Sequence, residues 1–154
     1  MAKRYWLMKS EEDVYSIREL EEEGTTCWEG VRNYEARNLM RDQMKVGDGV
    51  LFYHSNAKPP GVAGLATVAR TAYPDHFAFD KKNRYYDPKS DPENPRWFMV
   101  DVAFQETFGE VLSLDEIKAT PELREMALVK RARLSVQPVE KEAFQLIRKM
   151  GRKK

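Results

Sequence analysis

WFMVDVAFQETF, residues 97–108, is the stretch that decides the fold, because its alternating apolar side chains are typical of a long β-strand. Successive side chains of a strand point to opposite faces, so Trp97, Met99 and Asp101 are predicted to lie off the main core face. The residues predicted to face the core are Phe98, Val100, Val102 and Phe104. Four further apolar, β-branched and aromatic runs have strand length: residues 5–8, 49–55, 61–71 and 134–138.

Short helices are predicted between these strands. Ser16 and Glu19 have the spacing of a capping box at a helix start, and Ser113 with Glu116 repeats it. A last helix follows Pro138 and carries an apolar stripe of Ala143, Leu146, Ile147 and Met150. Strands interspersed with short helices predict an α+β fold, a small mixed β-barrel of about five or six strands with short peripheral helices.

Length and composition exclude several classes of protein. The chain has 154 residues, which predicts one domain over residues 1–154. Its 26 Lys and Arg residues balance 25 Asp and Glu residues, so any contact with a polyanion must be local. One cysteine and two histidines are too few for a disulfide framework or a structural zinc site. No apolar run approaches the roughly 18 residues of a membrane span. We expect a cytoplasmic protein with no metal, no cofactor and no membrane contact.

The segment 73–97 combines many Pro, Asp and Lys residues with six aromatic residues. Loops of this length in a compact domain are commonly functional or disordered. Disordered linkers are usually poor in aromatic residues, so we expect this loop to be ordered and packed on the body.

CWEGVRNYEARNLMRD, residues 27–42, combines a helix start with an unusual group of polar and aromatic side chains. If Asn33 is the N-cap, the helix begins at Tyr34. The stripe predicted to be buried, at helical spacing, is then Ala36, Leu39, Met40, Gln43 and Met44. On the opposite face lie Tyr34, Arg37, Asn38 and Arg41. Trp28 either plugs the barrel or lines its mouth. An aromatic ring, an amide and guanidinium groups together suit a planar heterocycle with a phosphate.

Seven segments, in order along nearly the whole chain, resemble the EVE domain family. They are WLMKSE at 6–11, WEGVRNYEARNLMRD at 28–42, VGDGVLFYHSN at 46–56, PPGVAGLATV at 59–68, YPD at 73–75, YYDPKSDPENPRWFMVDV at 85–102 and RLSVQPV at 133–139. The resemblance implies a PUA-like fold related to YTH readers of methylated adenine. It also implies a pocket for a flipped, modified base, with modified cytosine (5-methyl or 5-hydroxymethyl) in DNA as the favoured ligand. One departure is Glu12, where the family usually has proline.

The resemblance and the local chemistry together nominate base-binding or nucleic-acid-binding residues. Trp28 would form an aromatic wall, with Asn33 and Tyr34 beside it, and Lys9 and Ser10 would donate hydrogen bonds to base or phosphate. The full candidate set is Lys9, Ser10, Trp28, Arg32, Asn33, Tyr34, Arg37, Tyr53, His54, Ser55, Trp97, Ser135 and Gln137. His54 is equally consistent with a satisfied strand end. For Ser135 and Gln137 the strand alternation is an equally good explanation: Leu134 and Val136 would face inward, so the two polar side chains would simply point outward.

Two alternatives stay open. The protein could be an RNA-binding PUA-like module that recognises modified RNA, with a basic cluster along the phosphate backbone: Lys130, Arg131, Arg133, Arg152, Lys153 and Lys154. It could also be a small hydrolase that uses Cys27 and His54, but the sequence offers neither an orienting third group nor an oxyanion site. We therefore expect a binding module for nucleic acid with a modified base, DNA favoured, and not an enzyme.

Overall fold

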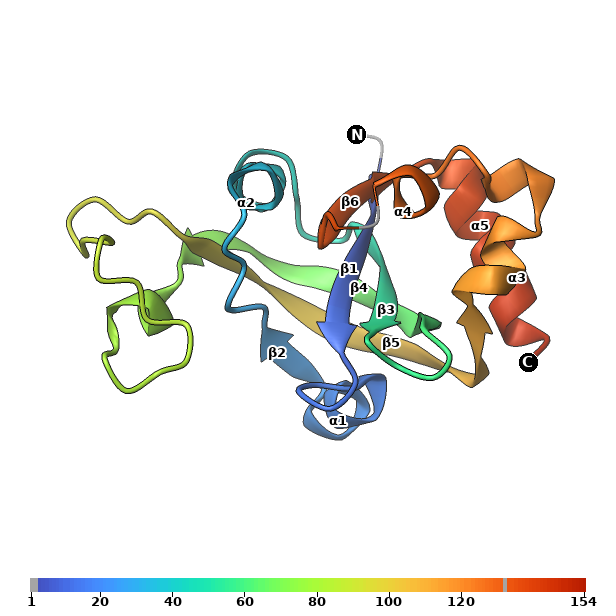
Figure 1. The fold of residues 1–154 in the computed structure, drawn as a ribbon, viewed down its shortest axis with the longest axis horizontal. Coiled ribbons are helices and arrows are strands. Elements are labelled where there is room, and N and C mark those ends of the chain that lie inside the picture. The colour runs from blue at the N-terminus through green and yellow to red at the C-terminus, as the bar shows by residue number, and fades with distance from the viewer. Residues whose placement is uncertain (1–2, 132) are drawn as a thin grey trace.

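The computed structural model describes residues 3–131 and 133–154. Its centre is one mixed sheet with the strand order β2-β5-β4-β3-β1-β6 (Figure 1). The strands are β1 (Tyr5–Glu11), β2 (Thr25–Cys27), β3 (Gly49–Ser55), β4 (Gly61–Pro74), β5 (Phe98–Ser113) and β6 (Val136–Val139). β1 pairs with β3 in parallel, and the other neighbours pair antiparallel. All five predicted strand runs are confirmed. The sequence did not predict β2, because its three residues are too short for a periodic pattern.

Five α-helices and two 3₁₀ turns surround the sheet within the described residues. They are α1 (Ile17–Glu23), α2 (Tyr34–Asp42), η1 (His76–Phe79), α3 (Leu114–Lys118), η2 (Pro121–Leu123), α4 (Ala127–Lys130) and α5 (Lys141–Arg152). Both predicted capping boxes are present: the Ser16 hydroxyl accepts from the Glu19 backbone N–H, and Ser113 does the same for Glu116. The α+β class is therefore confirmed.

The parallel pair of strands, β1 and β3, is covered on both faces of the sheet. Trp6 and Met8 of β1 pack in one hydrophobic cluster with residues of α1 and α2, whereas Leu7 packs in a second cluster with residues of α3, α4 and α5. A parallel pair covered on both sides is expected to be continuously apolar rather than alternating. β3 follows this rule, since all its residues from Gly49 to His54 are buried.

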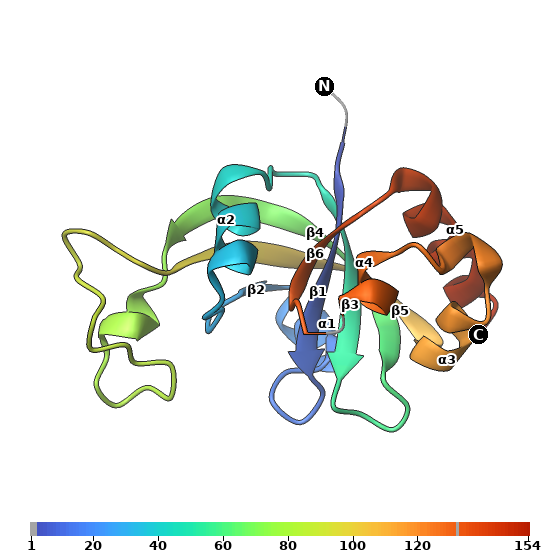
Figure 2. The same cartoon turned by 45° about the horizontal axis from the view of Figure 1, so that its top comes forward.

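The predicted closure of the sheet into a barrel is wrong. Among the residues that the structure describes, β2 and β6 are the two ends of the sheet and do not pair with each other. Helix α2 lies over the sheet and contacts β4, β5 and β6 (Figures 1 and 2). Side chains of α2 thus cover this face of the open sheet.

The apolar stripe of α2 is confirmed in part. Ala36, Met40 and Met44 are buried and Leu39 is partly buried. Gln43 does not belong to the stripe, because it is exposed and accepts a hydrogen bond of 2.9 Å from Arg4 Nη1. The Gln43 side chain therefore bonds to Arg4 at the surface instead of packing in the core.

The β4–β5 hairpin projects beyond the sheet and carries the long loop at one end of the molecule (Figure 1). Hydrogen bonds hold this loop together, as predicted for an ordered loop. Trp97 Nε1 donates to Asp87 Oδ2 at 2.6 Å, and the Asp87 N–H donates to the Ala78 carbonyl at 2.9 Å. The prediction for β5 holds for Val100 and Val102, which lie in the core. The other predicted core residues, Phe98 and Phe104, are only partly buried, because irregular pairing with β4 bends the strand. The loop and hairpin also bury Trp97 and Met99.

Candidate functional site

A hollow of about 470 Å³ lies where β1 ends, beside the segment between β2 and α2 and the long loop. Its volume is in the range of small-molecule sites. The predicted residues that line it are Lys9, Ser10, Trp28, Arg32, Ser55 and Ser135. We call this hollow the cavity. Part of the candidate set therefore lines one cavity, although these residues come from widely separated segments of the chain.

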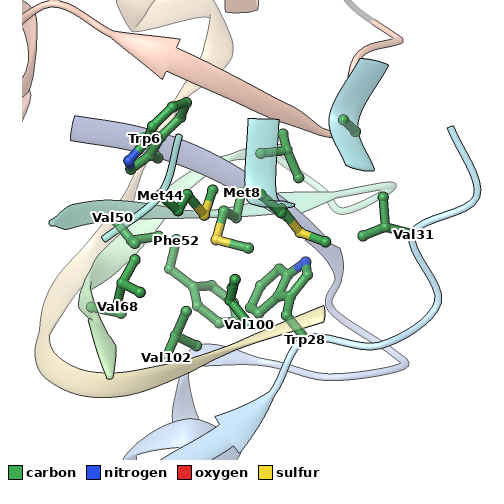
Figure 3. Close-up of a cluster of buried hydrophobic side chains, with 14 of the residues drawn as sticks. Trp6, Met8, Trp28, Val31, Met44, Val50, Phe52, Val68, Val100 and Val102 are labelled. Carbon is green, nitrogen blue, oxygen red and sulfur yellow. The ribbon is translucent and has the colours of Figure 1, made fainter. Parts of the chain in front are cut away.

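Trp28 serves both the core and the cavity. Its exposed fraction is only 8%, and its ring meets Phe52 edge to face at 5.4 Å. Figure 3 shows the ring among the buried side chains that include Met8 and Val100. Its backbone N–H donates to the Val100 carbonyl at 2.8 Å. Trp28 thus packs in the core and also lines the cavity, and its core contacts fix the orientation of the indole edge that reaches the cavity.

Asp75 does not line the cavity but holds two residues that do, Gly30 and Arg32, and sequence reasoning did not nominate it. Its carboxylate is fully buried and accepts three hydrogen bonds: from Gly30 N at 2.9 Å, from Arg32 Nη1 at 3.0 Å and from Phe77 N at 3.0 Å. Buried charges are stable when paired and hydrogen-bonded in this way. The carboxylate therefore ties the segment before α2 to the long loop. The signal available in the sequence was the YPD motif at 73–75.

Gly30 is required where the loop crosses this segment. It has φ of +82°, a conformation that favours glycine, and a Cβ placed there would lie 2.5 Å from the Tyr85 ring. Tyr85 also lines the cavity. A side chain at Gly30 would push this wall of the cavity away.

Arg32 is held by several partners at once. Its Nε and Nη2 donate to the Tyr85 carbonyl at 3.2 and 2.7 Å, in addition to the ion pair with Asp75. The guanidinium lies 5.6 Å from the Tyr85 ring centroid and 5.5 Å from that of Trp97. Such contacts fix a cation in one orientation. Arg32 is a rigid cationic part of the wall rather than a free side chain.

Asn33, Tyr34 and Arg37 lie outside the cavity. Asn33 is the N-cap of α2 as predicted, because its Oδ1 accepts from the Ala36 N–H at 3.0 Å. It lines a second hollow of about 410 Å³. Tyr34 is exposed and stacks on Trp97, and Arg37 lies over the Tyr34 ring. Trp97 itself is buried and is not part of the cavity lining.

Tyr53, His54 and Gln137 also do not line the cavity. Tyr53 packs in the hydrophobic cluster on the other side of the sheet. His54 Nε2 accepts from the Ile17 N–H at 3.1 Å, so the ring links β3 to α1. Gln137 is fully buried, and its amide donates to the Leu134 carbonyl at 2.8 Å. Leu134 and Val136 are inward, as alternation predicted, but the strand there is buried on both faces, so Gln137 is buried too.

Further residues around the cavity lie outside the predicted base-binding set, and of these only Cys27 and Arg133 were named from the sequence, in the two alternatives. The polar or charged ones are Glu11, Tyr15, Thr26, Cys27, Glu29, Arg84, Tyr85 and Arg133. The cavity has four basic side chains, Lys9, Arg32, Arg84 and Arg133, against the acids Glu11 and Glu29. A chain of nearly neutral net charge therefore concentrates positive charge at this site. Burial lowers the pKa of Lys9 from its ordinary value.

Residues 4–150 match the EVE domain family. The chain belongs to that family. Human (Homo sapiens) thymocyte nuclear protein 1 is 43% identical over 162 residues, which cover 93% of this chain and 72% of the human protein. A hypothetical protein from Leishmania major has a solved structure with TM-score 0.96 and 51% identity, covering 99% of this chain and 96% of that one. The structure of human THYN1 in complex with 5-methylcytosine-containing DNA has TM-score 0.91 and 42% identity and covers 99% of both chains.

The EVE fold also resembles that of a YTH domain. The YTH domain of the Zygosaccharomyces rouxii MRB1 protein, solved in complex with N6-methyladenosine RNA, aligns with TM-score 0.56 and 14% identity over 97% of this chain and 85% of that chain. At this identity the likeness shows the fold alone. The predicted relation of this EVE chain to YTH domains is confirmed at that level.

The geometry of this EVE domain disfavours a thiol nucleophile. Burial, with Glu29 next to it, raises the pKa of Cys27 to about 11, so the thiol is protonated at neutral pH. Its Sγ donates to Glu29 Oε2 at 3.5 Å. His54, the proposed base, does not line the cavity, and burial lowers its pKa. Cys27 thus lines the cavity as a protonated thiol that is hydrogen-bonded to Glu29.

Two further observations concern the described part of the EVE chain. It contains no group of three or more His, Cys, Asp or Glu side chains placed to hold a metal ion. None of its helices is both long enough and apolar enough to cross a membrane.

Proposed function

We propose that this EVE domain is a nucleic-acid reader that holds one extruded, modified base in the cavity, most favourably a 5-methylated or 5-hydroxymethylated cytosine in DNA. The observation that carries the proposal is the cavity itself, which brings Trp28, Lys9 and Ser135 together in the fold of a human relative whose structure contains 5-methylcytosine DNA. The proposal treats residues 1–154 as one domain that binds without catalysis, with no cofactor.

The wall chemistry suits one base. Trp28 presents an aromatic surface in an orientation fixed by the core, and stacking a base on an aromatic ring contributes about 1–3 kcal/mol. This gain is comparable with the few kcal/mol that extrusion of a base from a duplex costs. Binding is therefore expected to be tighter to single-stranded or mismatched sites than to a fully paired duplex.

Recognition of a methyl group by this cavity is modest on its own. Burial of one methyl-sized group contributes about 0.8 kcal/mol, which corresponds to about a fourfold gain in affinity. Polar side chains such as Ser10, Ser55 and Ser135 line the same cavity and offer hydroxyls to the base edge. We expect discrimination by the sum of a small apolar gain and hydrogen bonds to the base.

The local positive charge around the cavity suits the phosphate of the held nucleotide. Arg84 and Arg133 are exposed and line the cavity, so they are placed to meet a phosphate at its mouth. Each phosphate that is neutralised adds about 0.7 to the salt slope for a single strand. A shallow slope, corresponding to few phosphates, is expected.

The test is a binding panel by fluorescence anisotropy. DNA and RNA oligonucleotides carry one plain, 5-methylated or 5-hydroxymethylated cytosine, and they are measured with the native chain and Ser135→Phe, which fills the cavity. Val46→Phe, at a position with an exposed fraction of 64%, controls for an added aromatic ring. We expect preference for modified DNA that only Ser135→Phe removes. Preference for modified RNA would favour the RNA alternative, and indifference to modification in every context would refute the proposal.

The cellular location remains a prediction. The sequence favours the cytoplasm, whereas the related human protein is named a nuclear protein. Imaging of a tagged full-length chain would decide it.

A further inference from the structure

Tyr34, at the start of α2, is an exposed aromatic residue held in a fixed orientation. Its exposed fraction is 52%, and its ring stacks on Trp97 with centroids 4.9 Å apart and planes inclined by 21°. Trp97 is itself anchored, because Nε1 donates to Asp87 Oδ2 at 2.6 Å. Aromatic rings that are exposed yet rigidly backed are the usual platforms for stacking bases of a single strand.

Arg37 adds a cation to the same surface. Its guanidinium carbon lies 4.7 Å from the Tyr34 ring centroid, and its Nη1 donates to the Arg96 carbonyl at 2.8 Å. Nε and Nη2 donate to Asn38 Oδ1 at 3.0 and 2.8 Å. A guanidinium has five N–H donors, so these three bonds leave two for a ligand. The position of the cation is fixed, while part of its hydrogen-bonding capacity is unused.

The charge on Arg37 is less compensated than that of its basic neighbours. Arg41 pairs with Asp42 at 2.8 Å, and Arg96 has Asp87 at 3.8 Å. In the described part of the chain, the hydrogen-bond acceptors of Arg37 are neutral. Burial and then the positive charge of Arg41 lower the pKa of Arg37, with Arg96 acting in the same direction, whereas Tyr34 and the carboxylate of Asp42 offset part of this effect. A phosphate placed there would relieve this repulsion between like charges.

This surface lies near the cavity, because Arg32 lines the cavity and its guanidinium carbon is 5.5 Å from the Trp97 ring centroid on which Tyr34 stacks. The second hollow of about 410 Å³ is lined by Asn33, Arg131, Arg133 and Leu134. Arg133 also lines the cavity, and Asn33 immediately precedes Tyr34. Arg131 of this hollow is paired with Glu35 at 2.6 Å, so Arg133 is the basic side chain that a strand leaving the cavity meets on the way to the start of α2.

We propose that Tyr34 and Arg37 form a second nucleic-acid contact, which holds a nucleotide flanking the one in the cavity by stacking on Tyr34 and by a phosphate contact to Arg37. The occupant is a single-stranded segment of the same nucleic acid. This inference rests on the proposed function, because both require a nucleic-acid ligand, but it makes a separate prediction: the contact is used only by ligands longer than the nucleotide in the cavity.

The experiment compares 5-methyl-dCMP, followed by NMR titration, with a single-stranded DNA of about twelve nucleotides around one 5-methylcytosine, a length within known site sizes for stacking grooves. Tyr34→Ala is expected to weaken binding of the long strand roughly 5- to 100-fold and to leave binding of the mononucleotide unchanged. Tyr34→Phe keeps the ring and should retain affinity for the long strand. Arg37→Gln should reduce the salt slope for the long strand by about 0.7.

Matched controls separate this contact from the cavity. Val46→Ala truncates another exposed apolar side chain, and it should change neither affinity. An equal loss for both ligands in Tyr34→Ala, or a loss for neither, would overturn the inference. If methylation has no effect on the native chain but Tyr34→Ala still weakens the long strand, the proposed base pocket fails while the second contact stands.

Discussion

Replacement of Asp75 by Asn is expected to loosen the site and destabilise the protein. The buried carboxylate of Asp75 accepts from the N–H groups of Gly30 and Phe77 and from the guanidinium of Arg32. An amide keeps one oxygen and replaces the other by a donor, so in either orientation an NH₂ group faces a native donor. The substitution also removes the counter-charge of Arg32.

The magnitude follows from these contacts. Breaking a buried ion pair by removal of one partner typically costs about 3–5 kcal/mol. The Arg32 side chain is 23% exposed, so water can compensate for part of the loss, and we expect about 3 kcal/mol. For a chain of this length that corresponds to a decrease in Tm of roughly 6–12 °C.

The assay is urea unfolding of the native chain and of Asp75→Asn, together with hydrogen exchange of individual amides. Exchange at Gly30 and Phe77 should become faster than at amides in the core, because their acceptor is lost. Asp80→Asn is the matched control: Asp80 is exposed and accepts from the Lys82 N–H, which an amide oxygen can also do. The control should stay within about 0.5 kcal/mol of the native chain. A loss below about 1 kcal/mol in Asp75→Asn, with unchanged exchange at both amides, would refute this account of the carboxylate.

Three further predictions concern single residues. Both Gly30 and Gly47 have positive φ, but only at Gly30 would an added Cβ collide with an aromatic ring, that of Tyr85. Gly30→Ala should therefore lower the unfolding free energy in urea by at least about 1 kcal/mol more than Gly47→Ala. Equal losses would show that the collision does not matter. Cys27, whose pKa is raised to about 11, should react slowly with iodoacetamide at pH 7 and faster as pH rises toward that value; rapid alkylation at neutral pH would contradict it. His54 has a lowered pKa and accepts from the Ile17 N–H, so its neutral form stabilises the native state above the ordinary pKa of 6.5. That stability should be lost as pH falls below 6.5 toward the pKa of His54 in the folded state. The unfolding free energy of His54→Gln, measured between pH 5 and 7.5, should lack this pH-dependent contribution. If the variant and the native chain show the same pH dependence, His54 does not have this role.

Much of the local structure followed from local signals. The capping boxes at Ser16 and Ser113 and the N-cap at Asn33 are each made within four residues of chain, so the sequence alone contains both partners. The strand runs were predictable because burial of central strands requires continuous apolar residues. The EVE motifs, spread over nearly the whole chain, indicated the family before any geometry was known.

Two features could not be predicted from local sequence patterns: whether the sheet closes into a barrel, and which residues line the cavity. The open sheet and the position of α2 over β4, β5 and β6 depend on contacts between distant segments, which no periodicity specifies. Gln137 matched a family segment, yet the second face of its strand is also covered, so it is buried. Tyr34 and Arg37 matched the base-pocket chemistry, but the helix start directs them to a neighbouring surface.

The sequence by itself determined the α+β class, the element boundaries near capping residues, the family and the set of candidate site residues. Only the tertiary structure decided which of them share the cavity. Asp75 shows the physical reason: its partners Gly30 and Arg32 lie 45 and 43 residues away, and a buried carboxylate is stable only where the fold brings such donors together. Contacts at that separation arise from packing of the whole chain, not from any pattern within one segment.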